Sequence, residues 1–228
     1  MRIRRKGWMA IAVAAVWLHP GVGHDSTMVP QSSAQPVAAG DIANLLQQVH
    51  VIDQIPGVEG YDRGCGKGEG CVFGPAWNDP LDHSGCDSRN RILATSLQGV
   101  TFKPGTRNCK VVTGYLDPDP YTGQRIQLRD IEIDHIVSLA RAFDAGAWKW
   151  DPQQRQIFAN DPTELMAVSG SANRQKSDAG LNEWLPSYQP CTYIQRYLTV
   201  AVKYQLPITV AERNAAAAAC PAAPPTAT

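Results

Sequence analysis

The stretch that decides the fold of this chain is Ile131-Glu132-Ile133-Asp134-His135-Ile136-Val137. Apolar and polar side chains alternate over residues 126–135, which predicts a strand whose isoleucines face a core and whose acidic residues face the other way. His135 follows Asp134 at the end of this strand, where the chain can turn and let side chains converge. Thirty-eight residues after His135, Asn173 falls near the start of a predicted helix.

Together, Asp134, His135 and Asn173 have the donor atoms that phosphodiester hydrolysis requires. Carboxylate and amide oxygens suit a hard cation such as Mg²⁺, and a neutral histidine suits removal of a proton from water. The metal would neutralise charge on the scissile phosphate and on the departing oxygen. Lys176 lies on the same helix face as Asn173 and could contact a phosphate. The plainer alternative is a hydrogen-bonded surface pair and a helix-capping asparagine.

The N-terminal segment predicts export. Residues 1–23 contain a basic start, the apolar run 7–18 and a small-x-small pattern at Gly21-Val22-Gly23. Because a membrane span needs about 20 apolar residues, a cleaved signal peptide is favoured over a membrane anchor. After cleavage we expect no membrane attachment and a secreted protein, extracellular or periplasmic.

The net charge of the exported chain argues against a purely electrostatic nucleic-acid binder. The full chain has 21 Lys and Arg and 21 Asp and Glu, and residues 1–23 hold four basic residues and no acidic one, so cleavage leaves a net charge of −4. Binding by counterion release usually needs a strongly basic protein. Phosphate recognition would therefore need a divalent cation and a local basic patch, with Arg89, Arg155 and Arg174 as candidates. A solvated surface is the alternative for these arginines.

Six cysteines in an exported chain predict disulfide bonds. Six cysteines allow 15 pairings. Proximity along the chain favours the pairs Cys65–Cys71, Cys86–Cys109 and Cys191–Cys220. A zinc site is the weaker alternative, because no Cys-x-x-Cys pair is present.

The rest of the sequence predicts one mostly helical α+β domain, stapled by disulfides, with few and short strands. Residues 24–39 predict a disordered leader, residues 40–220 the folded domain, and residues 221–228 a flexible tail. Helices are expected after each of six polar residues, Asp41, Asp87, Ser138, Asp151, Ser171 and Thr209, and another is expected over 192–204. Strands are expected over 111–116, 126–135 and 164–168. Residues 55–86 are expected to form a glycine-rich loop.

Several short motifs also resemble those of one nuclease family. The motifs are Ile133–Leu139, Gly85-Cys86-Asp87-Ser88-Arg89-Asn90, Asp119–Gly123, Ala145–Trp148, Phe158–Pro162, Asn173-Arg174-Gln175-Lys176-Ser177-Asp178 and Glu183–Pro186. Their order and spacing over residues 57–212 are similar to those of secreted HNH endonucleases related to the C-terminal domain of GmrSD-type restriction endonucleases.

The resemblance implies a ββα-metal (HNH) core over about residues 126–180. It implies His135 as the general base, Asp134 and Asn173 as ligands of one Mg²⁺, with Mn²⁺ as a substitute, and Lys176 as a phosphate or transition-state contact. One departure is Glu164, which stands where HNH domains commonly have a middle asparagine that orients the histidine. Glu164 could hold the loop, join the metal shell or weaken activity, and Asn160 could take the middle role.

The sequence therefore predicts a secreted, monomeric, metal-dependent endonuclease that cleaves DNA, or RNA, with little sequence preference. Nothing resembles a separate recognition module such as a helix-turn-helix. Two alternatives stay open: a catalytically silent HNH-like nucleic-acid-binding protein, and a secreted, disulfide-stapled interaction domain without metal. Trp148, Trp150 and Trp184 are expected in the core rather than stacked on bases, and Tyr121 is expected to shape a turn.

Overall fold

The structure is a computed structural model that describes residues 39–221. The predicted signal peptide lies outside the described residues, as do the predicted leader and tail apart from Ala39 and Pro221. Helices and short strands are mixed along the chain, so the fold is α+β as expected. None of the helices within residues 39–221 is both long enough and apolar enough to cross a membrane.

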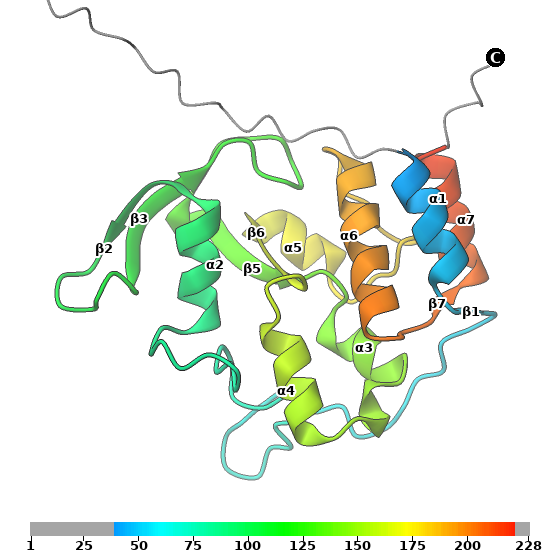
Figure 1. The fold of residues 1–228 in the computed structure, drawn as a ribbon, viewed down its shortest axis with the longest axis horizontal. Helices are drawn as coiled ribbons and strands as arrows, with labels where there is room; N and C mark the ends of the chain where they lie inside the picture. The colour runs from blue at the N-terminus through cyan, green and yellow to red at the C-terminus, as the bar shows by residue number, and fades with distance from the viewer. Residues whose placement is uncertain (1–38, 222–228) are drawn as a thin grey trace, which may run out of the picture. The chain divides into compact units, whose positions relative to one another are not determined.

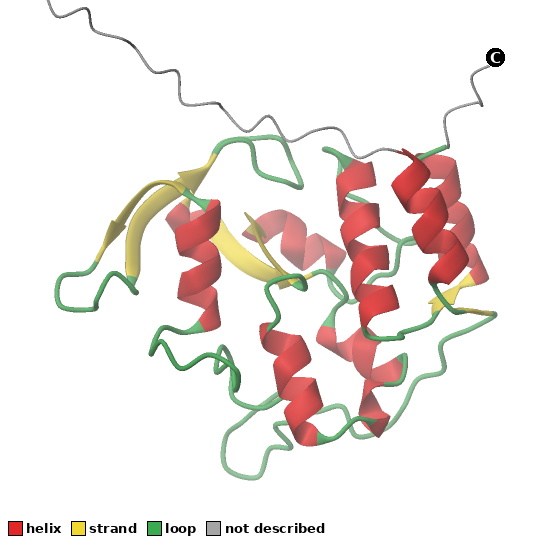
Figure 2. Ribbon diagram, viewed as in Figure 1, coloured by secondary structure: helices red, strands yellow, loops and turns green. Residues whose placement is uncertain are grey.

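The helices are α1 (Ala39–Gln48), α2 (Ser88–Ser96), α3 (Leu139–Asp144), α4 (Pro152–Asn160), α5 (Gly170–Lys176), α6 (Pro190–Lys203) and α7 (Val210–Ala219). The strands are β1 (Val51–Ile52), β2 (Gln98–Phe102), β3 (Val111–Leu116), β4 (Ile126–Gln127), β5 (Ile131–His135), β6 (Leu165–Ser169) and β7 (Ile208–Thr209). They form three small sheets: parallel β1–β7, antiparallel β2–β3–β4 and antiparallel β5–β6. Figure 2 shows β2 and β3 as a ribbon at one edge of the domain, while β5 and β6 lie among the helices.

Local sequence explains where most helices begin. The Asp87 and Asp151 carboxylates cap α2 and α4, and Pro152 takes the first helical position of α4. Thr209 and Glu212 form a reciprocal capping box at the start of α7. These starts are confirmed, whereas α1 begins at Ala39, so that Asp41 falls in its first turn instead of capping it.

Helices α1, α6 and α7 lie side by side (Figure 1). One apolar face of α6 is buried, as its spacing predicts; its members are Ile194, Tyr197, Leu198 and Ala201. Beneath these helices β1 pairs in parallel with β7, with Val51 opposite Ile208. A strand near the start of the described chain therefore pairs with a strand near its end.

A buried polar group links α7 to α3. The Glu212 carboxylate is fully buried, and it accepts hydrogen bonds from Arg141 Nη2 at 2.7 Å and from Tyr197 Oη at 3.0 Å. Burial raises the pKa of Tyr197, so its hydroxyl keeps its proton and donates. The pair anchors α3, which directly follows the end of β5.

Three disulfide bonds are present, Cys65–Cys71, Cys86–Cys109 and Cys191–Cys220, which are the pairs expected from proximity. No cysteine of residues 39–221 is free. The zinc alternative is therefore wrong, because no thiolate is left to bind the metal.

Removal of the Cys191–Cys220 bond is expected to lower the free energy of unfolding by about 3–4 kcal/mol, because it releases the longest of the three closed loops. Removal of the Cys65–Cys71 bond, which closes a loop of separation 6, is expected to cost about 2 kcal/mol. Urea denaturation of the two paired Cys→Ser variants measures the difference. Equal unfolding free energies for the two variants would contradict the loop-entropy explanation.

Three predicted elements differ in the structure. The strand predicted over 126–135 is divided by a 3-10 helix, Leu128–Asp130, so that β4 pairs with β3 while β5 pairs with β6. Strand β6 begins one residue later than predicted, at Leu165, and β2 is a strand that the sequence pattern did not indicate. Helix α5 begins at Gly170 rather than after Ser171, and it ends at Lys176 because Ser177 has a φ of 52°.

Aromatic packing follows the prediction in part. Trp150 and Trp184 pack against the main core, with the Trp184 ring 5.0 Å from the ring of Tyr121. Trp148 is 45% exposed, so the prediction that it lies in the core is wrong. Trp148 belongs to the 3-10 helix Ala147–Lys149, and Lys149 Nζ lies 5.1 Å from the centre of its ring.

Candidate active site

Strands β5 and β6 and helix α5 form the frame of the candidate site. The antiparallel register places Asp134 opposite Met166 and His135 opposite Leu165. Helix α5 follows β6 directly and packs back on β5 (Figure 1). The frame therefore brings Asn173, on α5, to the side of the strand pair that carries Asp134.

Asp134 is buried, although strand alternation places it on the face opposite the isoleucines. Its Oδ1 accepts a hydrogen bond from Lys176 Nζ at 2.9 Å, and its Oδ2 accepts one from the Tyr121 hydroxyl. Burial raises the pKa of Asp134, and the lysine and tyrosine offset that rise in part. Each carboxylate oxygen keeps one further lone pair with which it could bind a cation.

Lys176 has a different role from the predicted phosphate contact. Its side chain is only 1% exposed, and its Nζ lies 2.9 Å from Asp134 Oδ1 and 2.8 Å from the main-chain oxygen of His135. The predicted face of α5 is correct, but that face points into the protein. The prediction of a phosphate contact is wrong for this structure: Lys176 ties α5 to the end of β5 and neutralises Asp134.

The imidazole of His135 is held in one orientation. Its Nε2 lies 3.0 Å from the main-chain oxygen of Ala159, and because a carbonyl oxygen only accepts, Nε2 carries the hydrogen and Nδ1 is the free acceptor. Trp77 stacks on the ring, with 5.9 Å between ring centres and 14° between planes. Burial, with a smaller contribution from the Arg63 charge, lowers the pKa of His135 to about 3. The imidazole is therefore neutral at pH 7, with Nδ1 unprotonated.

Asp134, His135 and Asn173 line one cleft of about 370 Å³. The cleft is also lined by Tyr61, Arg63, Ile133, Ser138, Leu139, Ala140, Ser177 and Asp178. Asn173 Nδ2 donates to Glu132 Oε2 at 2.9 Å. A carboxylate only accepts, so the amide nitrogen faces Glu132 and the amide oxygen remains for another partner. The structure thus brings together the three residues predicted to act together, and it adds Glu132 as a contact of Asn173. The position of Glu132, two residues before Asp134 on one strand face, was the sequence feature that could have indicated this contact.

Glu164 does not line this cleft and is fully buried. Its carboxylate accepts the main-chain N–H of Val137 at 3.1 and 3.2 Å, and its main-chain oxygen accepts that of Ile136 at 2.8 Å. Burial raises the pKa of Glu164 well above its usual value. Among the predicted alternatives, holding the loop is what the structure supports, whereas a catalytic group would have to reach the cleft.

Asn160 stands next to the carbonyl group that orients His135. Its Nδ2 donates to the main-chain oxygens of Gln156 at 2.9 Å and of Asn78 at 3.2 Å, and its Oδ1 accepts from the Ser88 hydroxyl. These bonds fix the end of α4, and with it the Ala159 oxygen. Asn160 thus holds the backbone next to the carbonyl group that contacts His135.

The three predicted arginines do not gather at the cleft. Arg155 Nε donates to the main-chain oxygen of Val72 at 2.5 Å, and its Nη1 donates to the main-chain oxygens of Ala147 and Trp150, so its guanidinium holds a loop. Arg174 pairs with Glu132 and lines a neighbouring cavity, while Arg89 lies on α2 and lines neither cavity beside His135. The predicted patch of these three residues is not assembled. Arg63, which sequence reasoning missed, is the arginine that lines the cleft.

The donor atoms of the cleft fit one Mg²⁺ better than they fit a zinc ion. Within residues 39–221 no group of three or more His, Cys, Asp and Glu side chains could hold a metal. Mg²⁺ keeps several waters and needs only one or two carboxylates. The Asp134 carboxylate and the Asn173 amide oxygen on one cleft meet that smaller requirement.

Residues 87–219, more than half of the chain, match the model of the family described as GmrSD restriction endonucleases, C-terminal domain. The chain belongs to this family.

One curated relative is a protein of Arthroderma benhamiae described as an uncharacterized secreted protein. It is 40% identical over 135 residues, which are 57% of this chain and 64% of the relative. The matched part thus spans less than two thirds of the relative's length. No solved structure matches the chain. The secreted relative and the three disulfide bonds fit an extracellular protein.

Proposed function

We propose that the protein is a secreted, metal-dependent HNH endonuclease that hydrolyses phosphodiester bonds in DNA, or RNA, with little sequence preference. The observation that carries this proposal is the cleft on which Asp134, His135 and Asn173 meet. Membership of a nuclease-related family supports it. In this proposal β5, β6 and α5 are the ββα-metal core.

His135 is the general base of the proposed reaction. Its Nε2–H is held by the Ala159 oxygen, so Nδ1 removes a proton from a water molecule that attacks phosphorus. The lowered pKa leaves Nδ1 unprotonated, so it can accept a hydrogen bond from that water molecule. Trp77, stacked on the ring, limits its rotation.

Asp134 and Asn173 are the residues that would hold one Mg²⁺, or Mn²⁺ in its place. When bound, the ion supplies positive charge to the phosphate and to the departing oxygen. Lys176 and Tyr121 orient the Asp134 carboxylate, and Glu132 orients the Asn173 amide. Such outer partners fix the direction of metal ligands in proteins.

A catalytically silent nucleic-acid-binding protein is the second candidate. It is favoured by one observation: the Asp134 charge is already balanced by the Lys176 ammonium group at 2.9 Å. Plasmid nicking by the pure, oxidised protein separates the two candidates. Nicking with Mg²⁺ that stops in EDTA supports the enzyme, and absence of nicking with either Mg²⁺ or Mn²⁺ supports the silent protein.

Asn173→Ala is expected to weaken Mn²⁺ binding because it removes a ligand oxygen. The loss should be at least roughly 10–100-fold, which is the effect of losing a residue that only orients a metal ligand. Isothermal titration calorimetry of Mn²⁺ measures the change. Asn182→Ala, at an exposed asparagine beyond α5, is the matched control and should bind as the unmodified protein does. Equal affinities for the two variants would exclude Asn173 as a ligand.

A further inference from the structure

We propose that Arg63, two residues before the Cys65–Cys71 disulfide bond, binds the phosphate group that is cleaved at His135. The inference rests on the proposed function and deepens it. It concerns a part of the chain that precedes the stretch matched by the family model, residues 87–219. The loop of residues 61–77 would then line the active site opposite the strand pair and α5.

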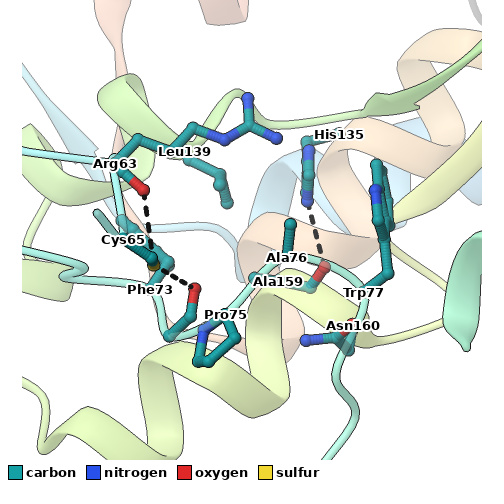
Figure 3. A pocket seen from close by; sticks show the side chains of 11 residues that line it. Arg63, Cys65, Phe73, Pro75, Ala76, Trp77, His135, Leu139, Ala159 and Asn160 are labelled. Atoms are coloured by element: carbon teal, nitrogen blue, oxygen red, sulfur yellow. Dashed lines mark hydrogen bonds between the residues drawn. The ribbon is translucent and has the colours of Figure 1, made fainter. Parts of the chain in front are cut away.

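Two cavities meet at His135, and Arg63 borders both. One is the cleft that Asp134 and Asn173 also line, and the other is a smaller, largely apolar cavity of about 120 Å³ that Trp77 also lines. Figure 3 shows Arg63 and Trp77 on two sides of the His135 imidazole, with the Arg63 side chain extended toward it. A phosphodiester chain that crosses His135 from one cavity to the other would pass the guanidinium group.

The guanidinium group of Arg63 is available for a ligand. Arg63 is exposed, and none of the salt bridges found within residues 39–221 involves it. Arg155, by contrast, is bonded to main-chain oxygens, and Arg174 is paired with Glu132. Arg63 is thus an unpaired cation beside the candidate base.

The cleft needs such a cation. Lys176 is buried beneath it and already neutralised by Asp134, so it cannot offer a charge to the substrate. Among the described residues that line the cleft, Arg63 is the one Lys or Arg side chain. Guanidinium groups match phosphate oxygens through two parallel hydrogen bonds, which positions the phosphate as well as attracting it.

Hydrogen bonds and a disulfide bond stabilise the conformation of the loop that carries Arg63. The Asp62 carboxylate accepts the main-chain N–H groups of Gly64 at 3.1 Å and Gly70 at 2.6 Å. The Cys65–Cys71 bond closes the same turn, and Arg155 fixes its far end through the Val72 oxygen. A side chain carried on an already ordered backbone loses less conformational freedom on ligand binding than one on a mobile loop.

Arg63→Gln is the test variant, and Arg213→Gln is the matched control, because Arg213 is an exposed residue on α7 outside both cavities. Binding of a fluorescent DNA duplex is measured by anisotropy in EDTA, where no metal supports cleavage, over a series of KCl concentrations. Loss of one phosphate contact is expected to lower the slope of log affinity against log salt by about 0.9 in Arg63→Gln alone. With Mg²⁺, kcat/KM of Arg63→Gln is expected to fall roughly 10²-fold, with partial recovery in Arg63→Lys.

The outcomes separate the two proposals. If the unmodified protein cleaves DNA and the Arg63→Gln and Arg213→Gln variants show the same salt slope and the same kcat/KM, the role of Arg63 is overturned while the nuclease stands. If the unmodified protein does not cleave with Mg²⁺ or Mn²⁺, the proposed function fails first. A fall in kcat/KM without any change in salt slope would also overturn the phosphate contact, because a merely structural role would leave the slope unchanged.

Discussion

His135→Ala is expected to lower the rate of plasmid cleavage by roughly 10²–10⁴-fold, the contribution of a general base to such reactions. The fold should be retained, because Lys176 bonds to the main-chain oxygen of residue 135, which alanine also has. The β5–β6 hydrogen bonds are likewise made by main-chain atoms. Time courses of supercoiled plasmid loss with Mg²⁺ measure the rate, and circular dichroism checks the fold.

The matched control for His135→Ala is His83→Ala, at an exposed histidine in the loop before α2. It removes the same group and should leave the rate unchanged. Mn²⁺ binding should survive in His135→Ala, since the proposed ligands are Asp134 and Asn173. A His135→Ala protein that is folded, binds metal and cuts at the original rate would remove the histidine from the mechanism.

Lys176→Met is expected to lower the free energy of unfolding by about 3–5 kcal/mol, because it leaves the buried Asp134 carboxylate without its cation. Methionine keeps most of the apolar length of the lysine side chain, so the lost charge is the main change. The same variant should also bind metal differently, since the Asp134 carboxylate loses the group that orients it. Urea denaturation followed by fluorescence measures the stability.

A second substitution tests whether charge is the cause. Asp134→Asn added to Lys176→Met removes both charges, and the amide oxygen can still accept the Tyr121 hydrogen bond. The double variant should recover most of the lost stability, because replacement of a whole buried pair is often close to neutral. If the double variant is as unstable as the sum of the single ones, the two side chains are not energetically coupled.

The central part of the site could be predicted from the sequence. Strand alternation placed Asp134 at a strand end beside His135, and a second strand followed by a helix returned Asn173 to the same place. Each step follows from local periodicity and short connections. The caps at Asp87, Asp151 and Thr209 were local in the same way, and these caps are confirmed.

The environment of the site could not be predicted in that way. Tyr121, Arg63 and Trp77 reach it from loops whose paths are set by tertiary packing and by disulfide bonds. Lys176 was placed on the correct helix face, but lysine is rarely fully buried unless it is paired, and nothing local showed that this face would be covered. For the same reason the sequence did not show that the guanidinium group of Arg155 is hydrogen-bonded to main-chain oxygens.

The division of the strand predicted over 126–135 has a mark in the sequence that the prediction overlooked. Apolar residues stand at 126 and 128 and then at 131 and 133, so the alternation changes phase at Arg129-Asp130. These two residues lie in the 3-10 helix Leu128–Asp130. The break allows β4 and β5 to belong to different sheets.

The pairing of β1 with β7, and of Arg141 with Glu212, has a consequence for biosynthesis. A nascent chain still attached to the ribosome, or only part-way through a translocation channel, lacks residues 208–212 until almost all of the domain has emerged. Until then its first strand has no partner, and the helix that follows His135 has no anchor. For the proposed nuclease, the site would thus be completed only when nearly all of this domain has emerged.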